Sequence, residues 1–232
     1  MPEVWPSATA IGALGATATK SGRIQVGELS TLVTDFLLGA LTLLLGVILL
    51  TRPGVPARLW GWAFVASAFA AFVGGVWHGF HQVLADTVQF WMWKAVMILS
   101  GLFAILAVIG SVRASCPTRV GYAVLAVLFA GAVAYGFAIV GHDDFRYVLL
   151  FSALAMVLLV AIHAAALRRR DAASPWILAG VAISVLGAAA YATGFSPFGW
   201  LNGSDVFHII QMAAMYLMFR GALAFGVTPR RA

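Results

Sequence analysis

Seven long apolar runs, separated by short connections, constrain the fold of this chain more than any other feature. A helix that crosses a bilayer needs about 20 apolar residues, and its backbone must satisfy its own hydrogen bonds there. Only 9% of the residues are charged, whereas a soluble domain carries about 25%. The sequence therefore predicts an all-α integral membrane protein, a bundle of seven transmembrane helices. We expect these at residues 31–50, 59–80, 87–110, 120–140, 147–167, 175–193 and 206–225.

Arginines lie at alternate ends of these runs and indicate an orientation. Cytoplasmic loops are enriched in Lys and Arg, so we expect the N-terminus outside and the C-terminus in the cytoplasm. The expected location is a bacterial inner membrane. No continuous basic stripe suggests nucleic-acid binding. We expect an extracytoplasmic, interfacial segment at 1–30, one seven-helix domain at 31–226 and a cytoplasmic tail at 227–232. The ten arginines at these alternate ends are Arg52, Arg58, Arg113, Arg119, Arg168, Arg169, Arg170, Arg220, Arg230 and Arg231.

The opposite ends of the runs gather four of the five histidines and seven of the eight acidic residues. Ionisable groups at membrane depth are costly, so their repetition at one depth predicts a polar site. The members nearest the apolar runs are Asp35, His78, His81, Asp205 and His208. At the other end we find only Asp171 and His163, and we expect His163 to lie at the membrane interface. Lys94 lies two turns into the third run and needs a carboxylate partner, for which we expect Asp35.

Imidazole and carboxylate groups in a partly dry cavity are the ligands that zinc prefers. A catalytic zinc takes three protein ligands and lowers the pKa of its bound water to about 7. We expect His78 and His208 as ligands, with His81 or Asp205 as the third. Asp35 or Asp205 would then act as the catalytic base or support a ligand.

Two segments resemble the CREST superfamily of seven-helix membrane proteins, which includes alkaline ceramidases and adiponectin-type receptors. They are Gly74-Gly75-Val76-Trp77-His78-Gly79 and Ser204-Asp205-Val206-Phe207-His208-Ile209-Ile210-Gln211. The resemblance implies zinc between the second, third and seventh spans, and hydrolysis of a lipid amide or ester by zinc-bound water. The family's two histidines in the last span, four residues apart, are matched here only by His208, since Met212 follows it.

Two other kinds of function remain open from the residues alone. His78 and His208, on different helices at similar depth, could ligate one heme iron in an electron-transfer protein. Alternatively, the polar layer could form an outward-facing ligand pocket or a proton relay without chemistry. Membrane lipids are the expected partners, and the chain could form an oligomer or be a subunit of a larger complex.

Overall fold

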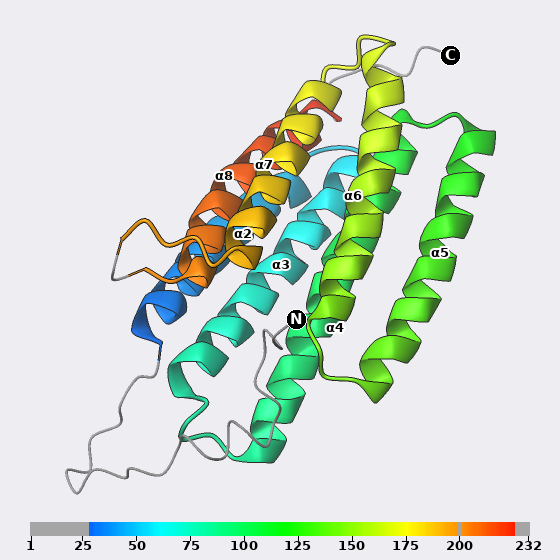
Figure 1. Ribbon diagram of the computed structural model, residues 1–232. Helices are drawn as coiled ribbons and strands as arrows, with labels where there is room; N and C mark the ends of the chain where they lie inside the picture. The colour runs from blue at the N-terminus through cyan, green and yellow to red at the C-terminus, as the bar shows by residue number, and fades with distance from the viewer. Residues whose placement is uncertain (1–27, 199–200, 226–232) are drawn as a thin grey trace, which may run out of the picture.

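The computed structural model describes residues 28–198 and 201–225, and these fold into seven helices (Figure 1). Each is long and apolar enough to cross a membrane, which confirms a seven-helix, multi-pass integral membrane protein. The expected segments at 1–30 and 227–232 fall almost entirely outside the described residues. The helices are α2 (Leu29–Leu50), α3 (Val55–Phe80), α4 (Asp86–Ser115), α5 (Thr118–Gly141), α6 (Arg146–Leu167), α7 (Ser174–Ala192) and α8 (Gly203–Ala224).

Local sequence signals determine where several helices begin. Gly54, at φ 94°, turns the chain between α2 and α3, and Pro56 follows in the first turn of α3. Proline is tolerated there because the first N–H groups of a helix have no partner within it. Helix α3 therefore begins four residues earlier than expected. Pro175 occupies the same position in α7.

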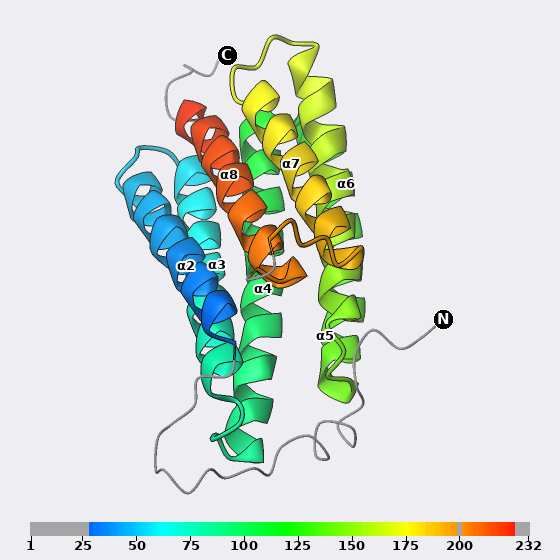
Figure 2. The ribbon, with the colours of Figure 1, turned by 60° about the vertical axis from the view of Figure 1, so that its left-hand side comes forward.

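Successive helices run in opposite directions, so the bundle has two chemically different ends (Figures 1 and 2). At one end α2, α4, α6 and α8 begin, and we call it the polar end. At the other end these four helices finish, and we call it the arginine end because Arg52, Arg113 and Arg168–Arg170 lie there. The alternation seen in the sequence is thus a division in space.

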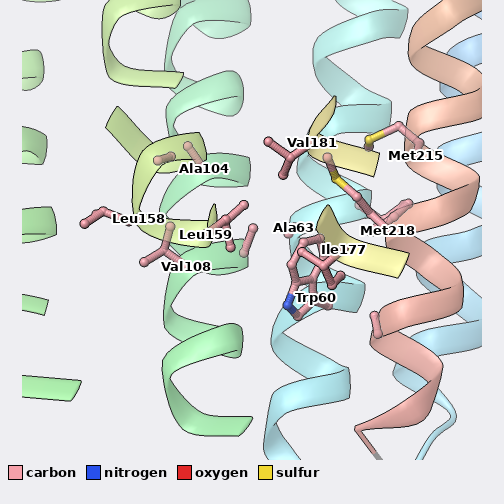
Figure 3. Packing of buried hydrophobic residues seen from close by; sticks show 14 of the residues in the cluster. Trp60, Ala63, Ala104, Val108, Leu158, Leu159, Ile177, Val181, Met215 and Met218 are labelled. Carbon is pink, nitrogen blue, oxygen red and sulfur yellow. The ribbon is translucent and has the colours of Figure 1, made fainter. Parts of the chain in front are cut away.

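The packing order places α2 and α8 side by side although they are far apart in sequence. Helix α2 packs on α3 and α8, α3 packs on α4, and α7 packs on α8, while α5 touches only α4 and α6 (Figure 2). Trp60 of α3, Ile177 of α7 and Met218 of α8 belong to one buried apolar cluster that joins these layers (Figure 3). The first and last spans therefore share an interface.

Glycines allow close packing between several helix pairs, including α7–α8 and α2–α3. A methyl group on Gly180 of α7 would lie 2.6 Å from Met218 Cγ and 2.9 Å from the Ala214 carbonyl oxygen of α8. In the α2–α3 pair, a methyl group on Gly75 would lie 2.9 Å from the Phe36 ring. Small residues allow such approach of membrane helices, where packing replaces the hydrophobic effect as the source of stability.

We expect Gly180→Ala to lower the melting temperature of the detergent-purified protein, because the Ala214 backbone cannot yield to the added methyl group. Overpacking of this kind costs about 1–3 kcal/mol. Gly136→Ala in α5 is the matched control, since its methyl group would meet nothing within 4 Å. Equal melting temperatures for the two variants would contradict the tight α7–α8 contact.

Candidate functional site

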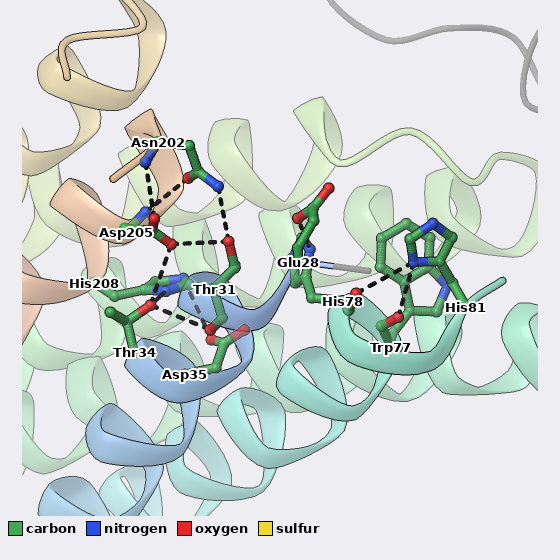
Figure 4. Close-up of polar contacts among 10 residues, drawn as sticks. All are labelled: Glu28, Thr31, Thr34, Asp35, Trp77, His78, His81, Asn202, Asp205 and His208. Carbon is green, nitrogen blue, oxygen red and sulfur yellow. Dashed lines mark hydrogen bonds and ion pairs between the residues drawn. The ribbon is translucent and has the colours of Figure 1, made fainter. Parts of the chain in front are cut away.

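Six polar residues meet where α2 and α8 begin, at the polar end (Figure 4). Residues three and four apart share one helix face, so α2 presents one polar face and the first turns of α8 present another. All six except Asn202 are buried. They are Thr31, Thr34 and Asp35 from α2, and Asn202, Asp205 and His208 from α8 and its N-cap.

Asp205 joins the start of α8 to α2. Its Oδ2 accepts from the Asn202 backbone N–H at 2.8 Å, while Asn202 Oδ1 accepts from the Asp205 N–H at 3.0 Å, forming a capping box. Its Oδ1 accepts from the Thr31 hydroxyl at 2.8 Å, and Asn202 Nδ2 donates to that hydroxyl at 2.8 Å. The carboxylate is completely buried, and both of its oxygens have partners. Asp205, expected as a catalytic group, thus caps α8 and fastens it to α2.

His208 uses both ring nitrogens across the same interface. Its Nδ1 lies 3.0 Å from Thr34 Oγ1, and its Nε2 lies 3.3 Å from Asp35 Oδ1. The Thr34 hydroxyl has one proton, and the Thr31 carbonyl oxygen at 3.1 Å is an acceptor for it. We therefore assign Thr34 as the acceptor of the Nδ1 proton. In this arrangement Nε2 and Asp35 share one dissociable proton, either as a neutral pair or as an ion pair.

The order hydroxyl, imidazole, carboxylate in Thr34, His208 and Asp35 is also that of an activated nucleophile. Activation requires the hydroxyl to donate its proton to the imidazole. Here the acceptors for the hydroxyl proton are the Thr31 carbonyl of the same helix at 3.1 Å, a common bond for helical threonine, and Asp205 Oδ1 at 3.5 Å. The arrangement therefore favours proton binding over nucleophilic attack.

Glu28 and His78 form a second ionisable pair beside this cluster. His78 Nδ1 lies 2.7 Å from Glu28 Oε2, and the Glu28 backbone N–H donates to the His78 carbonyl oxygen at 3.2 Å. The hydrogen bond from His78 holds the pKa of the Glu28 carboxyl below its ordinary value, against the opposing effect of partial burial. Glu28 was not singled out from the sequence, although it continues the face of Thr31 and Asp35.

The three histidines expected to bind zinc have separate partners. His81 Nδ1 faces the carbonyl oxygens of Trp77 and His78, its ring stacks on Trp77, and it lies on the far side of His78 from His208 (Figure 4). Among residues 28–198 and 201–225, no three His, Cys, Asp or Glu side chains are placed to hold a metal ion. The described residues as placed do not fit a zinc site. The zinc, heme and lipid-hydrolase expectations stay predictions.

The expected partner of Lys94 is wrong. Its ammonium lies 2.7 Å from Asp143 Oδ1 and donates to the backbone carbonyls of Ile139 and His142. Those carbonyls belong to the C-terminal end of α5, where a helix leaves acceptors without partners and a cation is favourable. Lys94 therefore fastens α5 to α4, and Asp35 is left to His208.

The expectation for His163 is also wrong, because its side chain is completely buried instead of interfacial. Its Nε2 lies 3.0 Å from Ser111 Oγ of α4, and its Nδ1 lies 3.0 Å from Ser174 Oγ of α7. The Ser174 hydroxyl and backbone N–H both donate to Asp171. This chain of contacts, the arginine-end network, joins α4, α6 and α7. No sequence signal marked Ser111 and Ser174, because α4 also contains Ser100 and Ser115 and α7 also contains Ser184.

A shallow pocket opens over the α2–α8 cluster. Its walls include Glu28, Ser30, Thr34 and Asn202 as polar residues, together with Leu29, Val33 and Leu201. Thr34 lines the pocket and also contacts His208. The Thr34 hydroxyl would thus lie between a molecule in the pocket and His208, which shares a proton with Asp35.

The Glu28–His78 pair makes a pH-dependent prediction. Because the pKa of Glu28 is lowered on folding, its contribution to stability is present above the unfolded-state value, about 4.3, and is lost as pH falls through the folded value. We expect Glu28→Gln to melt below wild type near neutral pH and to converge with it in acid. Asp86→Asn, at an exposed carboxyl in the first turn of α4, is the control. A difference that persisted unchanged at low pH would contradict the assignment.

Comparison with known proteins identifies a family whose function is unknown. No curated protein matches the chain. The profile of the DUF6962 family matches residues 30–227, which include all seven spans apart from the first residue of α2. The resemblance to the CREST superfamily stays a prediction. The chain belongs to DUF6962, a family of unknown function.

Proposed function

We propose that this protein binds a small polar ligand at the pocket over the α2–α8 cluster and exchanges a proton at the Asp35–His208 pair when it does so. The pocket faces the extracytoplasmic side in this proposal, because the arginine end carries the residues that mark the cytoplasmic side of a membrane. The observation that carries the proposal is the double role of Thr34, which lines the pocket and contacts His208.

The free-energy cost of burying the Asp35–His208 pair supports a functional role for it. Replacing a buried ion pair with apolar side chains is often neutral or stabilising, so such a pair is weak support for a structural role. Asp35 and His208 are both buried at membrane depth, and ionisable groups there mark ligand or proton sites more often than structural ones. Asp205, Thr31 and Asn202 already fasten α8 to α2. The Asp35–His208 pair is additional to these contacts.

The charge around the pocket favours a cationic or hydrogen-bond-donating ligand. Glu28 is the only charged residue among the described residues of the pocket wall, and Asp35 and Asp205 lie behind it. The side chains that can balance these carboxylates with positive charge are two imidazoles, those of His78 and His208. An anion would face three carboxyl groups, whereas a protonated amine could be accepted by the hydroxyl and amide oxygens of Ser30, Thr34 and Asn202.

Infrared difference spectroscopy during a pH titration tests the shared proton. We expect wild-type protein to show a protonated-carboxyl band that changes with pH, and Asp35→Asn to remove it. Asp86→Asn should leave the band in place, since that carboxyl lies in an exposed turn. A band that survives in Asp35→Asn, or none in wild type over the pH range in which the protein is folded, would overturn the proposal.

Metal analysis separates this proposal from the zinc hydrolase and the heme protein. We expect purified wild-type protein, His78→Ala and His208→Ala to contain no stoichiometric zinc and to be colourless after expression with heme supplied. Stoichiometric zinc that disappears in both variants would instead support the hydrolase, with a site that closes only around the metal. A heme spectrum lost in both variants would support electron transfer.

A further inference from the structure

We infer that α7 and α8 move as one rigid pair, which pivots at the arginine end and swings away from α2 at the polar end to admit the ligand. This inference rests on the proposed function, because it assigns the movement to the pocket described above. It follows from a contrast among three interfaces of the same two helices. Helices α7 and α8 contact each other by close backbone packing. At the arginine end a buried network joins them to the rest of the bundle. At the polar end α8 contacts α2 through side chains beside a pocket.

The α7–α8 contact has no room for relative movement. Gly180 and Gly221 each bring a backbone carbonyl of the partner helix to within 3.0 Å of the place a methyl group would occupy. Near the polar end, a methyl group on Gly187 would lie 3.2 Å from the Ile210 side chain and 3.3 Å from the Phe207 ring of α8. These contacts extend over most of both helices, so a force on the start of α8 is passed to α7.

The arginine end anchors both helices of the pair. Ser174, the first residue of α7, contacts His163 of α6, and Phe225, at the end of α8, stacks on the same imidazole with ring centroids 6.1 Å apart. The imidazole is fully buried and bonded at both nitrogens. Water therefore cannot replace these contacts, and the cost of breaking them is that of an unsatisfied buried polar group.

The connection between α6 and α7 at this end contains a backbone feature suited to a pivot. Arg170 has φ 58°, the only positive φ of a non-glycine residue in the described chain. A left-handed residue commonly closes the end of a helix, and hinges are short segments at element ends that take up changes in φ and ψ. The Arg169 and Arg170 backbone N–H groups still bond to the last turn of α6, so the turn is compact.

The polar end, in contrast, is joined to α2 through side chains next to a solvent-accessible pocket. Asp205 and His208 hydrogen-bond to Thr31 and Thr34, and His208 Nε2 lies 3.3 Å from Asp35 Oδ1. No backbone hydrogen bond links α8 to α2 among the described residues. Asn202 is exposed at the edge of this interface. A ligand that donates hydrogen bonds could compete for the same oxygens. The ionisable groups that face the Asp35–His208 pair are Glu28, His78 and Asp205.

Spin-label distances measure the swing directly. The chain has one cysteine, so Cys116→Ser provides a background for labelled cysteine pairs. Leu37 with Ile209 reports the polar half of the α2–α8 interface, and Val47 with Tyr216 reports the half toward the arginine end. Val185 with Ile209 lies within the α7–α8 pair and is the control. All five positions are exposed and lie outside the pocket and the cluster.

Thr31→Val with Thr34→Val removes hydrogen bonds across the interface at nearly constant side-chain volume. We expect the Leu37–Ile209 distance to lengthen beyond the width of the wild-type distribution, while the other two pairs keep theirs. Ser111→Ala with Ser174→Ala, which removes the partners of His163, should instead change the Val47–Tyr216 distance. Equal changes at both ends, a change within the α7–α8 pair, or no change in either variant would overturn the inference. If a double variant does not fold, Thr31→Val or Ser174→Ala alone carries the same test.

The two proposals fail differently. A titrating Asp35 band together with unchanged distances would leave the proton site standing and remove the pivot. Distances that respond without any titrating band would leave a moving helix pair and remove the proposed function.

Discussion

The rest of the structure depends on the requirement that polar groups inside a bilayer find their partners within the protein. Seven apolar helices could pack in many arrangements, because an apolar side chain is as stable in lipid as in the protein interior. The Asp205 carboxylate and the Asp35–His208 pair reduce these arrangements, because each needs α2 and α8 side by side at one depth. Lys94 does the same for α4 and α5, and His163 for α4, α6 and α7. A small number of buried polar contacts therefore specify the neighbours of nearly every helix.

The remaining interfaces are specified by close packing instead. Between α2 and α3, and between α7 and α8, glycines bring the helices together, and at the polar end of the α2–α3 contact the Asp35 side chain packs against Gly74 and Gly75. The glycine contacts between α7 and α8 are insensitive to protonation and ligand, whereas contacts through Thr34, Asp35 and His208 respond to both. The division between the two kinds of interface is what makes a rigid pair and a changeable boundary compatible in one bundle.

The sequence predicted the fold well because transmembrane spans depend on local composition alone. It also placed Asp35, Asp205 and His208 at one depth, since depth follows from position along a span. Which groups meet at that depth depends on the rotation of each helix about its axis and on which helices are neighbours. Neither can be predicted from the sequence of a single helix. Lys94 was therefore assigned to Asp35, whereas its ammonium contacts Asp143 and the carbonyls at the end of α5. His81 follows His78 by three residues yet turns to the carbonyl oxygens of its own helix. Neutral partners were the hardest to foresee, because Thr34, Ser111 and Ser174 carry no signal until a histidine lies beside them.

The bundle contains two buried histidines with polar partners at both ring nitrogens, and their surroundings explain why only one is assigned a function. His163 contacts two neutral hydroxyls, and the nearest carboxylate is reached only through Ser174. An imidazole that takes up a proton there would have no opposite charge in contact, so the neutral form is the one that fits. His208 contacts Asp35 directly and reaches a pocket through Thr34. A proton can be gained or lost there with a counter-charge in place, and a ligand can sense the change. The same side chain, at similar burial, is a fastening at one end of the bundle and a candidate binding site at the other.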